Sequence, residues 1–467
     1  MSWRTEEILL ATGGETLCKG RENIFNEVVT DSNKIESGSV FLALKGKRFD
    51  GHAFLRDAVR RGATCLVVHT KPSLSVLKEM TVIKVHDTLE ALGDLAFYRR
   101  QIVAPKVLAI TGSNGKTTIK EMVAAILERA RIRGTSLQGR ILKTEGNYNN
   151  LVGLPLTLLR LQGRERVAIL ELGTSCPGEI HRLTQIAHPD MGLICSVGPA
   201  HLAGLSSLAG VAREKGSLFQ DIRPGGVAVV NSDDPWVRRL GERFKGKKIA
   251  YGRKGEVRGE SCRCLGERGI EFTLHVGRKR RRIRLRLPGE HNLSNALGAA
   301  AMAYGLGVDL ATIRSGLEAI KPFPMRMAIE RWRGIGIIND TYNANPSSME
   351  AALKTLAEIG GKRKKTAVLG DMLELGKESR KRHRELGYQA AQLDIDRLYL
   401  LGEHADLVKA GTVVGGMEES QVTIGRNHRQ IARLARRQAK KGDWILFKGS
   451  RGMRLDKTLA EFKKIGK

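Results

Sequence analysis

The sequence predicts an α/β protein of three domains: a smaller N-terminal α/β domain, a central doubly wound sheet with a phosphate loop, and a C-terminal Rossmann-like domain. Three observations lead to this prediction. The 467 residues are about three times the length of a typical domain of ~150 residues. Short apolar strands alternate with segments of helix length along most of the chain. A glycine-rich segment, residues 112–118, lies between an apolar strand and a helix.

The N-terminal domain is expected to span residues 1–104. Runs of β-branched and apolar residues predict four short strands, and two longer segments have the spacing of helices. The strands are expected at 28–30, 39–44, 64–68 and 81–85, and the helices at 54–61 and 88–100. Pro105 then interrupts the chain and marks the boundary.

The central domain is expected to span residues 105–322 and the C-terminal domain residues 323–467, because Pro322 and Pro324 mark a second linker. Both domains contain near-continuous apolar strands, which are typical of a parallel sheet covered on both faces. The central strands are expected at 106–111, 167–172, 191–197 and 227–231, with a helix at 294–305. The C-terminal strands are expected at 335–339, 366–370, 397–401 and 444–448.

The composition indicates a globular, strongly basic protein. Hydrophobic residues make up 41% and charged residues 27%, which favours packed cores over disorder. The 79 Lys and Arg residues exceed the 49 Asp and Glu residues, so the net charge is +30. No apolar run reaches the ~18 residues of a membrane-spanning helix, and the first residues lack the pattern of a secretory signal. We therefore expect a cytoplasmic protein with no membrane span.

The basic charge raises the question of nucleic-acid binding, because phosphate neutralisation dominates that binding. The densest run is Arg-Lys-Arg-Arg-Arg at 278–282, continued by Arg284 and Arg286. Ile283, Leu285 and Leu287 alternate with these arginines, which predicts a half-buried strand of a basic hairpin. Aromatic residues are only 5%, few for base stacking. No nucleic-acid partner is therefore expected, and the charge equally suits small polyanionic substrates.

The segment from Gly112 to Thr118 has the Gly-Lys-Thr ending of a phosphate loop. Its glycines let backbone N–H groups face the phosphates, and the following helix N-terminus adds partial positive charge. In this arrangement Lys116 reaches the β- and γ-phosphates, and the Thr117 hydroxyl binds Mg²⁺. The strand before and the helix after the loop are the context that this mechanism needs. The loop therefore predicts ATP binding.

Three further residues follow predicted strands or lie on helices near the loop. Glu171 stands at the carboxyl end of an apolar strand, where a carboxylate faces the ligand crevice and can bind Mg²⁺. His201 follows another buried strand and could equally be a structural histidine. Lys215 lies on a predicted helix, where most lysines are solvated. From the residues alone, the roles of His201 and Lys215 stay open.

Two asparagines lie at the start of a predicted alanine-rich helix, one just before it and one in its first turn. Asn292 and Asn295 carry the paired donor and acceptor groups that can read an adenine edge. Alternatively, Asn292 or Ser294 caps the helix. The sequence does not choose between these two interpretations.

These segments occur in one order along the chain, and together they resemble the Mur ligases, the ATP-dependent amino-acid ligases of peptidoglycan precursor synthesis. The resemblance covers about residues 28–456. It rests on Thr-Gly-Ser-Asn-Gly-Lys-Thr-Thr (111–118), Glu-Gly-Asn-Tyr-Asn-Asn-Leu-Val-Gly-Leu-Pro (145–155), Glu-Leu-Gly (171–173), His201, Lys215, Asn-Ser-Asp-Asp-Pro (231–235), His291, Asn292, Asn295, Arg326, Asn-Asp-Thr-Tyr-Asn-Ala-Asn-Pro (339–346) and Lys-Gly-Ser-Arg (448–451).

The resemblance implies a set of roles. Lys116, His201 and Lys215 are catalytic, and one Mg²⁺ is held by Thr117 and Glu171 while a second is held by His201 and a carbamylated Lys215. ATP is bound by Gly112, Ser113, Asn114, Gly115, Lys116, Thr117, Thr118, His291, Asn292, Asn295, Arg326 and Asp340. The other substrates are bound by Thr30, Asp31, Ser32, Lys45, Phe49, Asp50, Gly51, His52, Asn147, Asn149, Asn150, Tyr342, Asn343 and Asn345.

Three stretches resemble the branch of the family that joins D-alanyl-D-alanine to UDP-N-acetylmuramoyl-tripeptide: residues 41–52, 340–350 and 368–376. The implied reaction forms an acyl phosphate from ATP and the tripeptide carboxylate, which the amine of D-alanyl-D-alanine then attacks. A monomer is expected. Two alternatives remain: a sister ligase that adds a different amino acid, and a basic ATPase that acts on nucleic acid. Ser347 follows Asn-Ala-Asn-Pro where the sister enzyme for the third residue carries an arginine.

Overall fold

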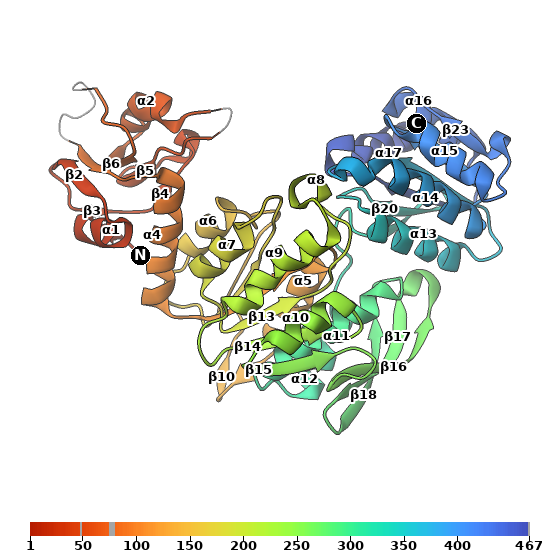
Figure 1. Cartoon of the computed structure of the whole chain (residues 1–467), viewed down its shortest axis with the longest axis horizontal. Coiled ribbons are helices and arrows are strands. Elements are labelled where there is room, and N and C mark those ends of the chain that lie inside the picture. Colours follow the sequence, from red (N-terminus) through yellow and green to blue (C-terminus); the bar gives the residue numbers. More distant parts are fainter. Residues whose placement is uncertain (47–48, 74–79, 466–467) are drawn as a thin grey trace.

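The structure is a computed structural model that describes residues 1–46, 49–73 and 80–465. Its three large sheets follow one another along the length of the molecule, with the N-terminal sheet at one end and the C-terminal sheet at the other (Figure 1). All three sheets mix parallel strands with antiparallel strands, and helices pack against them. The predicted α/β class with three domains is thus confirmed, while the boundaries after residues 104 and 322 stay predictions.

The N-terminal domain is built on the five-stranded sheet β2-β7-β6-β5-β4. A small pair, β1 (Trp3–Arg4) and β3 (Ile24–Phe25), lies outside it. The sheet strands are β2 (Glu15–Cys18), β4 (Val28–Val29), β5 (Ser39–Leu42), β6 (Ala63–Val68) and β7 (Thr81–Lys84). The helices are α1 (Thr5–Thr12), α2 (Leu55–Arg60) and α4 (Thr88–Val103).

Helix α4 joins the N-terminal domain to the central domain (Figure 1). It begins where the Asp87 carboxylate accepts the N–H groups of Leu89 and Glu90. Near its end, the buried Arg99 and Arg100 donate hydrogen bonds to the carbonyls of central-domain residues, including Leu161 and Ala187. These charge-assisted hydrogen bonds help to fasten α4 to the central domain.

The central domain has a nine-stranded sheet of order β11-β12-β8-β13-β14-β15-β16-β17-β18. Strands β8 and β11 to β15 run parallel, and β16 pairs parallel with β15. The pairs β16–β17 and β17–β18, which extend the sheet, are antiparallel. The strands are β8 (Lys106–Thr111), β11 (Ile141–Lys143), β12 (Val167–Glu171), β13 (Met191–Ile194), β14 (Val227–Asn231), β15 (Lys247–Tyr251), β16 (Val257–Cys264), β17 (Ile270–Val276) and β18 (Lys279–Leu285). A short hairpin, β9 (Arg131–Ile132) and β10 (Thr135–Ser136), lies apart.

Strand β8 lies inside this sheet, and its side chains alternate between two cores. Leu108 and Ile110 pack under one layer of helices, whereas Val107 and Ala109 pack under the other. The first layer consists of α5 (Lys116–Leu127), α11 (His291–Gly305) and α12 (Leu310–Glu318). The second consists of α6 (Gly153–Leu159), α7 (Glu179–Ala187), α9 (Leu208–Gln220) and α10 (Pro235–Arg243).

The predicted basic hairpin is present as β17 and β18, and it belongs to the central sheet rather than standing apart. Several predicted bounds differ from the observed ones by one to three residues, and two of these lie beside the candidate site. The strand expected at 191–197 ends at Ile194, because the next residues bond to the phosphate loop; Ser113 N–H, for example, donates to the Ser196 carbonyl. The helix expected from Ser294 begins at His291.

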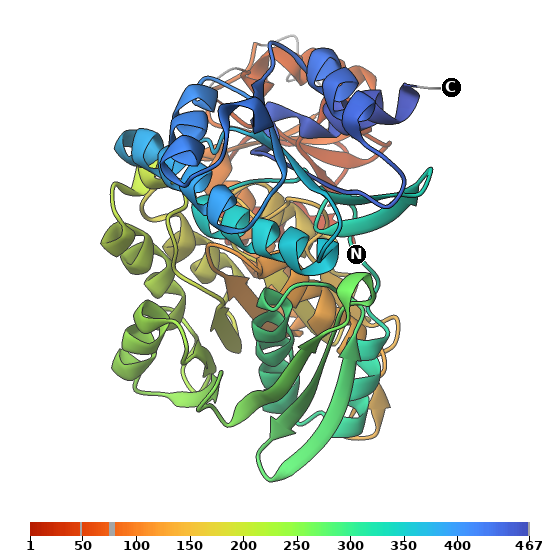
Figure 2. The ribbon, with the colours of Figure 1, turned by 90° about the vertical axis from the view of Figure 1, so that its right-hand side faces the viewer.

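The C-terminal domain contains the six-stranded sheet β19-β20-β24-β21-β22-β23, and viewed end-on it lies over the central domain (Figure 2). The strands are β19 (Ala328–Trp332), β20 (Ile335–Asp340), β21 (Lys365–Gly370), β22 (Arg397–Leu401), β23 (Val422–Ile424) and β24 (Trp444–Lys448). Helices α13 (Pro346–Gly360), α14 (Ser379–Gln392) and α15 (Ala405–Val414) cover one face. Helices α16 (His428–Gln438) and α17 (Leu455–Lys464) cover the other.

Within the described residues, no helix combines the length and the apolar character that crossing a membrane requires.

Candidate active site

The phosphate loop connects β8 to α5, as the sequence predicts. Gly112 and Gly115 have φ angles of 150° and 88°, in the region that favours glycine. A Cβ atom on Gly112 would lie 2.7 Å from the Cys195 sulfur, so the loop also needs glycine for its close packing. Lys116 Nζ donates to the Gly112 carbonyl at 2.7 Å, which holds its positive charge over the loop. The loop thus offers backbone donors, a helix N-terminus and a lysine to one anion.

Glu171 lies at the end of β12, next to the start of α5, and is only 3% exposed. Thr117 Oγ1 donates to its Oε2 at 2.7 Å, and Asn149 Nδ2 donates to its Oε1 at 2.8 Å. A buried carboxylate beside a hydroxyl supplies the oxygen ligands that Mg²⁺ prefers. Thr117 and Glu171 therefore fit the predicted metal site.

His201 and Lys215 come from the segment after β13. His201 precedes the short helix α8 (Leu202–Leu205), and its Nδ1 lies 2.5 Å from the Glu374 carboxylate of the C-terminal domain. Lys215 lies on α9 and is 1% exposed. Burial, and secondarily the charge of Lys116, lower the pKa of the Lys215 amine to about 7. With this pKa about half of the amine is neutral at pH 7, and a neutral amine can react with CO₂, which fits the predicted carbamylation.

The two asparagines of α11 do not cap the helix. The helix starts one residue before Asn292, and the capping position, Glu290, makes no side-chain cap. Asn292 Nδ2 instead donates to the Pro288 carbonyl at 2.7 Å, and Asn295 Nδ2 donates to Asn292 Oδ1 at 3.0 Å. The neighbouring His291 has its pKa lowered to about 4 by burial, so its ring is neutral.

The C-terminal domain contributes a second set of polar groups. The Arg326 guanidinium stacks 3.8 Å from the centre of the Tyr342 ring. Asp340 accepts a hydrogen bond from the Met327 N–H at 3.1 Å and pairs with the buried Lys448. Lys448 belongs to the segment 448–451 that resembles the family, but the sequence analysis does not predict it as a site residue. Its position at the end of a buried strand points to the site, since the neighbouring strand ends carry site residues.

One amide pair links the phosphate loop directly to the C-terminal domain. Asn345 Nδ2 donates to Asn114 Oδ1 at 2.8 Å, and Asn114 Nδ2 donates to Asn345 Oδ1 at 3.2 Å. Asn345 also caps α13 by accepting the Ser348 N–H at 2.9 Å. The same side chain therefore starts a helix and fastens two domains.

These two roles of Asn345 can be separated by substitution. We expect Asn345→Asp to keep the cap and the melting temperature but to lose the donor toward Asn114, which raises the KM for ATP about fivefold, the value of one hydrogen bond of ~1 kcal/mol. Asn345→Ala also loses the cap and should destabilise the protein by ~1 kcal/mol. Asn427→Asp, at the cap of α16, is the matched control. If Asn345→Asp had the same KM for ATP as Asn427→Asp, the result would contradict the role of the amide pair between Asn114 and Asn345.

Most predicted ATP and metal residues line one cavity of about 650 Å³ between the central and C-terminal domains. The predicted residues that line it are Ser113, Asn114, Gly115, Lys116, Thr117, Thr118, Asn147, Asn149, Asn150, Glu171, His201, His291, Asn292, Asn295, Arg326, Asp340, Tyr342, Asn343 and Asn345. Among the described residues, Glu179, Lys448 and Arg451 also line this cavity, although the sequence did not predict them. Gly112 and Lys215 were predicted site residues but do not line it.

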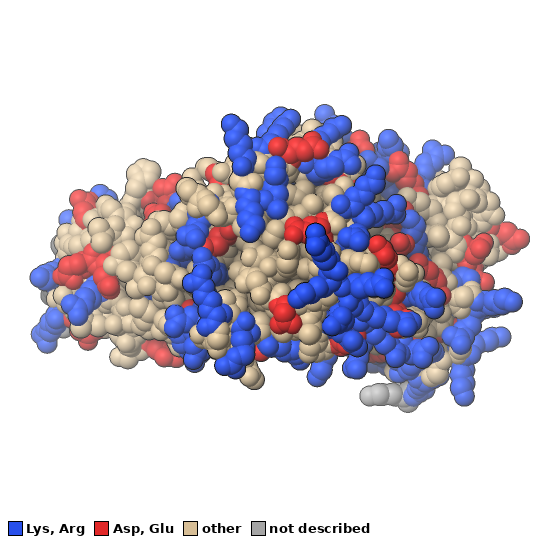
Figure 3. All heavy atoms as spheres, turned by 90° about the horizontal axis from the view of Figure 1, so that it is seen from below, with Lys and Arg blue, Asp and Glu red and all other residues tan. Residues whose placement is uncertain are grey.

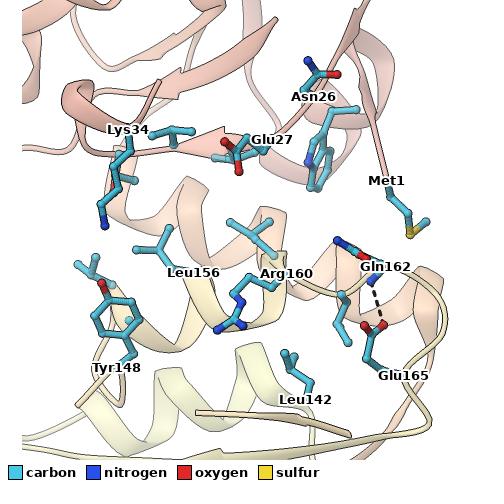
Figure 4. A pocket seen from close by; sticks show the side chains of 18 of the residues that line it. Met1, Asn26, Glu27, Lys34, Leu142, Tyr148, Leu156, Arg160, Gln162 and Glu165 are labelled. Carbon is cyan, nitrogen blue, oxygen red and sulfur yellow. Dashed lines mark hydrogen bonds between the residues drawn. The ribbon is translucent and has the colours of Figure 1, made fainter. Parts of the chain in front are cut away.

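A larger cavity of about 1250 Å³ lies between the N-terminal and central domains (Figure 4). Lys34 and Glu27 approach it from the N-terminal domain, and Arg160 approaches from the central domain (Figure 4). The predicted residues Thr30 and Asp31 line it. Asn147 and Asn150 line both cavities, so a loop of the central domain forms a shared wall.

The remaining predicted substrate residues gather elsewhere on the N-terminal domain. Lys45 pairs with Asp50 in an antiparallel bridge, and Asp50 accepts a hydrogen bond from His52 Nδ1 at 2.7 Å. Phe49 is 75% exposed. In this structure Lys45, Phe49, Asp50, Gly51 and His52 do not line either cavity, and neither does Ser32. Residues 47 and 48, inside the predicted segment, lie outside the described part of the chain.

The excess of basic residues lies mainly on the outer surface. Seen from below, Lys and Arg side chains crowd much of the molecule (Figure 3). On the β17–β18 hairpin every basic residue from Arg278 to Arg286 is exposed, and Arg282 pairs with Glu271. Few of these charges reach the two cavities. The charge is thus a property of the surface rather than of the candidate active site.

Comparison with known proteins identifies the family. Residues 25–100 match the family model described as Mur ligase family, catalytic domain; residues 110–303 match the Mur ligase middle domain; and residues 325–451 match the Mur ligase, glutamate ligase domain. The chain is 34% identical over 449 residues to the UDP-N-acetylmuramoyl-tripeptide–D-alanyl-D-alanine ligase of Bacillus subtilis, covering 94% of this chain and 93% of that protein. The chain belongs to the Mur ligase family.

Other Mur ligases agree in sequence and in structure. The Escherichia coli protein with the same name is 37% identical over 402 residues, which cover 85% of this chain and 86% of that protein. A crystal structure of MurF from Acinetobacter baumannii has a TM-score of 0.91 at 32% identity and covers 99% of both chains. MurF ligase from Thermotoga maritima, solved in complex with ADP, has a TM-score of 0.82 at 29% identity, covering 94% of this chain and 97% of that one.

Proposed function

We propose that the protein joins D-alanyl-D-alanine to UDP-N-acetylmuramoyl-tripeptide and converts ATP to ADP and phosphate, forming UDP-N-acetylmuramoyl-pentapeptide for peptidoglycan synthesis. Mur ligases that carry this name share 31–37% identity with most of the chain. The observation that carries the proposal is the cavity in which a phosphate loop, a buried carboxylate and polar groups of two domains meet. ATP use is further supported by the MurF ligase solved with ADP.

The reaction proceeds in two steps at this cavity. The terminal carboxylate of the tripeptide attacks the γ-phosphorus of ATP, so an acyl phosphate forms and ADP leaves. The amine of D-alanyl-D-alanine then attacks the acyl carbon, loses a proton, and displaces phosphate as the peptide bond forms. Lys116 and the backbone donors of the loop stabilise the negative charge on the transferred phosphoryl group. The docked C-terminal domain excludes water that would hydrolyse the acyl phosphate.

Mg²⁺ would neutralise phosphate charge when it is bound. We assign Thr117 and Glu171 to one ion, and His201 with a carbamylated Lys215 to a second. The neutral pair Asn292 and Asn295 suits an adenine edge. The proposed site of the uridine nucleotide is the larger cavity, together with the segment from Lys45 to His52. The reaction is assigned to the cytoplasm, where ATP is available, and to a monomer.

The decisive experiment measures phosphate release from ATP with each substrate alone and with both together. We expect release only when both UDP-N-acetylmuramoyl-tripeptide and D-alanyl-D-alanine are present, with a pentapeptide product identified by mass. Tripeptides ending in lysine and in diaminopimelate are tested in parallel. Release with a single amino acid instead of the dipeptide would favour a sister ligase. Stimulation by duplex DNA that falls steeply with salt would favour a nucleic-acid ATPase.

The lowered pKa of the Lys215 amine predicts that activity depends on CO₂. Only the neutral amine reacts with CO₂, giving a carbamate and releasing a proton. Because the pKa of Lys215 is about 7, the neutral fraction falls about tenfold between pH 8 and pH 6. We expect removal of CO₂ at pH 8 to lower activity and bicarbonate to restore it, with weaker restoration at pH 6.

The variant Lys215→Arg, which cannot form the carbamate, should be inactive with or without bicarbonate. Wild-type activity that does not change on rigorous removal of CO₂ would contradict the carbamate.

A further inference from the structure

Glu374 connects the C-terminal domain to His201. It lies in the loop after β21 with a φ of 64°, a left-handed conformation that is unusual for a residue with a side chain. Its Oε2 accepts a hydrogen bond from His201 Nδ1 at 2.5 Å, and its carbonyl accepts the Ala203 N–H at 3.0 Å. His201 is also left-handed, with a φ of 55°. Two strained residues from different domains thus meet at the edge of the cavity, and such strain concentrates at functional sites.

The contact decides which nitrogen of His201 carries the proton. An ionised carboxylate can only accept, so Nδ1 carries the hydrogen of this contact. Nε2 is then the ring nitrogen that the contact leaves available for a metal ion. Metal-binding histidines commonly have this arrangement, in which a carboxylate fixes the ring and leaves the other nitrogen free to bind.

The loop that carries Glu374 is held on both sides. His383 Nε2 accepts the Met372 N–H at 3.0 Å, and His383 Nδ1 donates to the Ser379 carbonyl at 2.7 Å. The Leu373 N–H donates to Ser450 Oγ at 2.8 Å. Asp371, His383 and His404 lie close enough to suggest a metal cluster. However, both nitrogens of His383 are already hydrogen-bonded, so the cluster braces the loop.

We propose that Glu374 is a positioning residue that fixes His201 as the Nδ1–H tautomer when the C-terminal domain docks, so that the second magnesium site is completed only in the closed molecule. The role of His201 toward magnesium rests on the proposed function. The placement of the Nδ1 hydrogen toward Glu374 does not, since it follows from the contact. The contact thereby links the metal site to the domain that covers the cavity.

Three variants test this. Glu374→Gly suits the φ of 64°, so the loop keeps its conformation while the carboxylate is lost. Glu374→Gln keeps an acceptor of the same length. Glu267→Gln is the matched control, because Glu267 makes another ion pair between the two domains, with Arg331 at 2.8 Å, and does not line the cavity.

The first measurement is the tautomer of His201 in the full-length protein labelled with ¹⁵N-histidine, recorded with ADP and without metal. Long-range ¹H–¹⁵N spectra distinguish the two tautomers, and His201→Gln identifies the signal. We expect the Nδ1–H form in the wild type, in Glu374→Gln and in Glu267→Gln, and its loss in Glu374→Gly. The same spectrum for the wild type and Glu374→Gly would overturn the proposal.

The second measurement is direct binding of Mn²⁺, as a probe for Mg²⁺, followed by electron paramagnetic resonance, together with the Mg²⁺ concentration for half-maximal activity. Glu374→Gly should weaken both about 10- to 100-fold, as loss of a ligand-orienting group usually does. Glu374→Gln should recover most of that loss, and Glu267→Gln should match the wild type. A changed tautomer with unchanged metal binding would also overturn the coupling. Neither result would alter a positive ligation assay, so the proposed function is judged separately.

Discussion

Replacing Lys116 with alanine is expected to lower kcat for ligation by about 10³-fold, with the fold intact. Its Nζ donates a hydrogen bond to the Gly112 carbonyl, which keeps the amine over the phosphate loop. There it faces the phosphates in the proposed binding mode. The charge of the transferred phosphoryl group develops in the transition state, so removing a preorganised positive group raises the barrier; loss of one donor at such a site costs 10²- to 10³-fold. The measurement is single-turnover formation of acyl phosphate and pentapeptide.

The control for Lys116→Ala is Lys106→Ala. Lys106 lies at the other end of the same strand. Its exposed Nζ pairs with Asp190 at 3.0 Å, and Asp190 keeps Arg223 as a second partner. Such pairs contribute at most ~1 kcal/mol, so activity should stay within about twofold of the wild type. Ligation by Lys116→Ala at more than a tenth of the wild-type rate would contradict the role assigned to the phosphate loop.

Replacing Glu171 with glutamine is expected to lower kcat by at least ~10²-fold and to raise the Mg²⁺ requirement. The substitution preserves size but removes the negative charge beside Thr117, and a neutral amide oxygen is a weaker ligand for a hard divalent cation. Glu171 is buried, and Thr117 and Asn149 hold its two carboxylate oxygens in place. The measurement is activity as a function of Mg²⁺, with Mn²⁺ binding as the second readout.

Glu179→Gln is the control for this variant. Glu179 also lines the cavity, but its Oε2 accepts the backbone N–H groups of Ser175 and Cys176. A glutamine oxygen can accept the same hydrogen bonds, so a loss of less than about threefold is expected. If both variants were equally impaired, the effect would reflect the charge of the cavity in general and would argue against a specific ligand at Glu171.

The sequence predicts the buried parallel strands well and the short exposed strands poorly. Strands β14, β22 and β24 have the predicted bounds, because a strand covered on both faces is a nearly continuous apolar run. Strand β2 was not predicted. Its four residues include no buried side chain, and its pairing with β7 is set by the rest of the domain.

The residues of the candidate site also differ in how well the sequence predicts them. The phosphate loop and Glu171 follow local patterns, since a strand end and a helix start place them without reference to distant residues. The contact between His201 and Glu374 joins residues 173 positions apart, and no local pattern indicates it. The larger cavity is likewise lined by residues of two domains that are far apart in the sequence. Sequence patterns predict the parts of a domain better than the contacts between domains.

The wall shared by the two cavities has a consequence for substrate length. Asn147 and Asn150 line both the proposed nucleotide cavity and the cavity of the phosphate loop, so they lie between the two. A precursor anchored by its nucleotide must therefore reach across the wall to bring its carboxylate to ATP. We expect activity to depend on the length of the peptide. A precursor one residue shorter should bind, but its carboxylate should not reach the γ-phosphate.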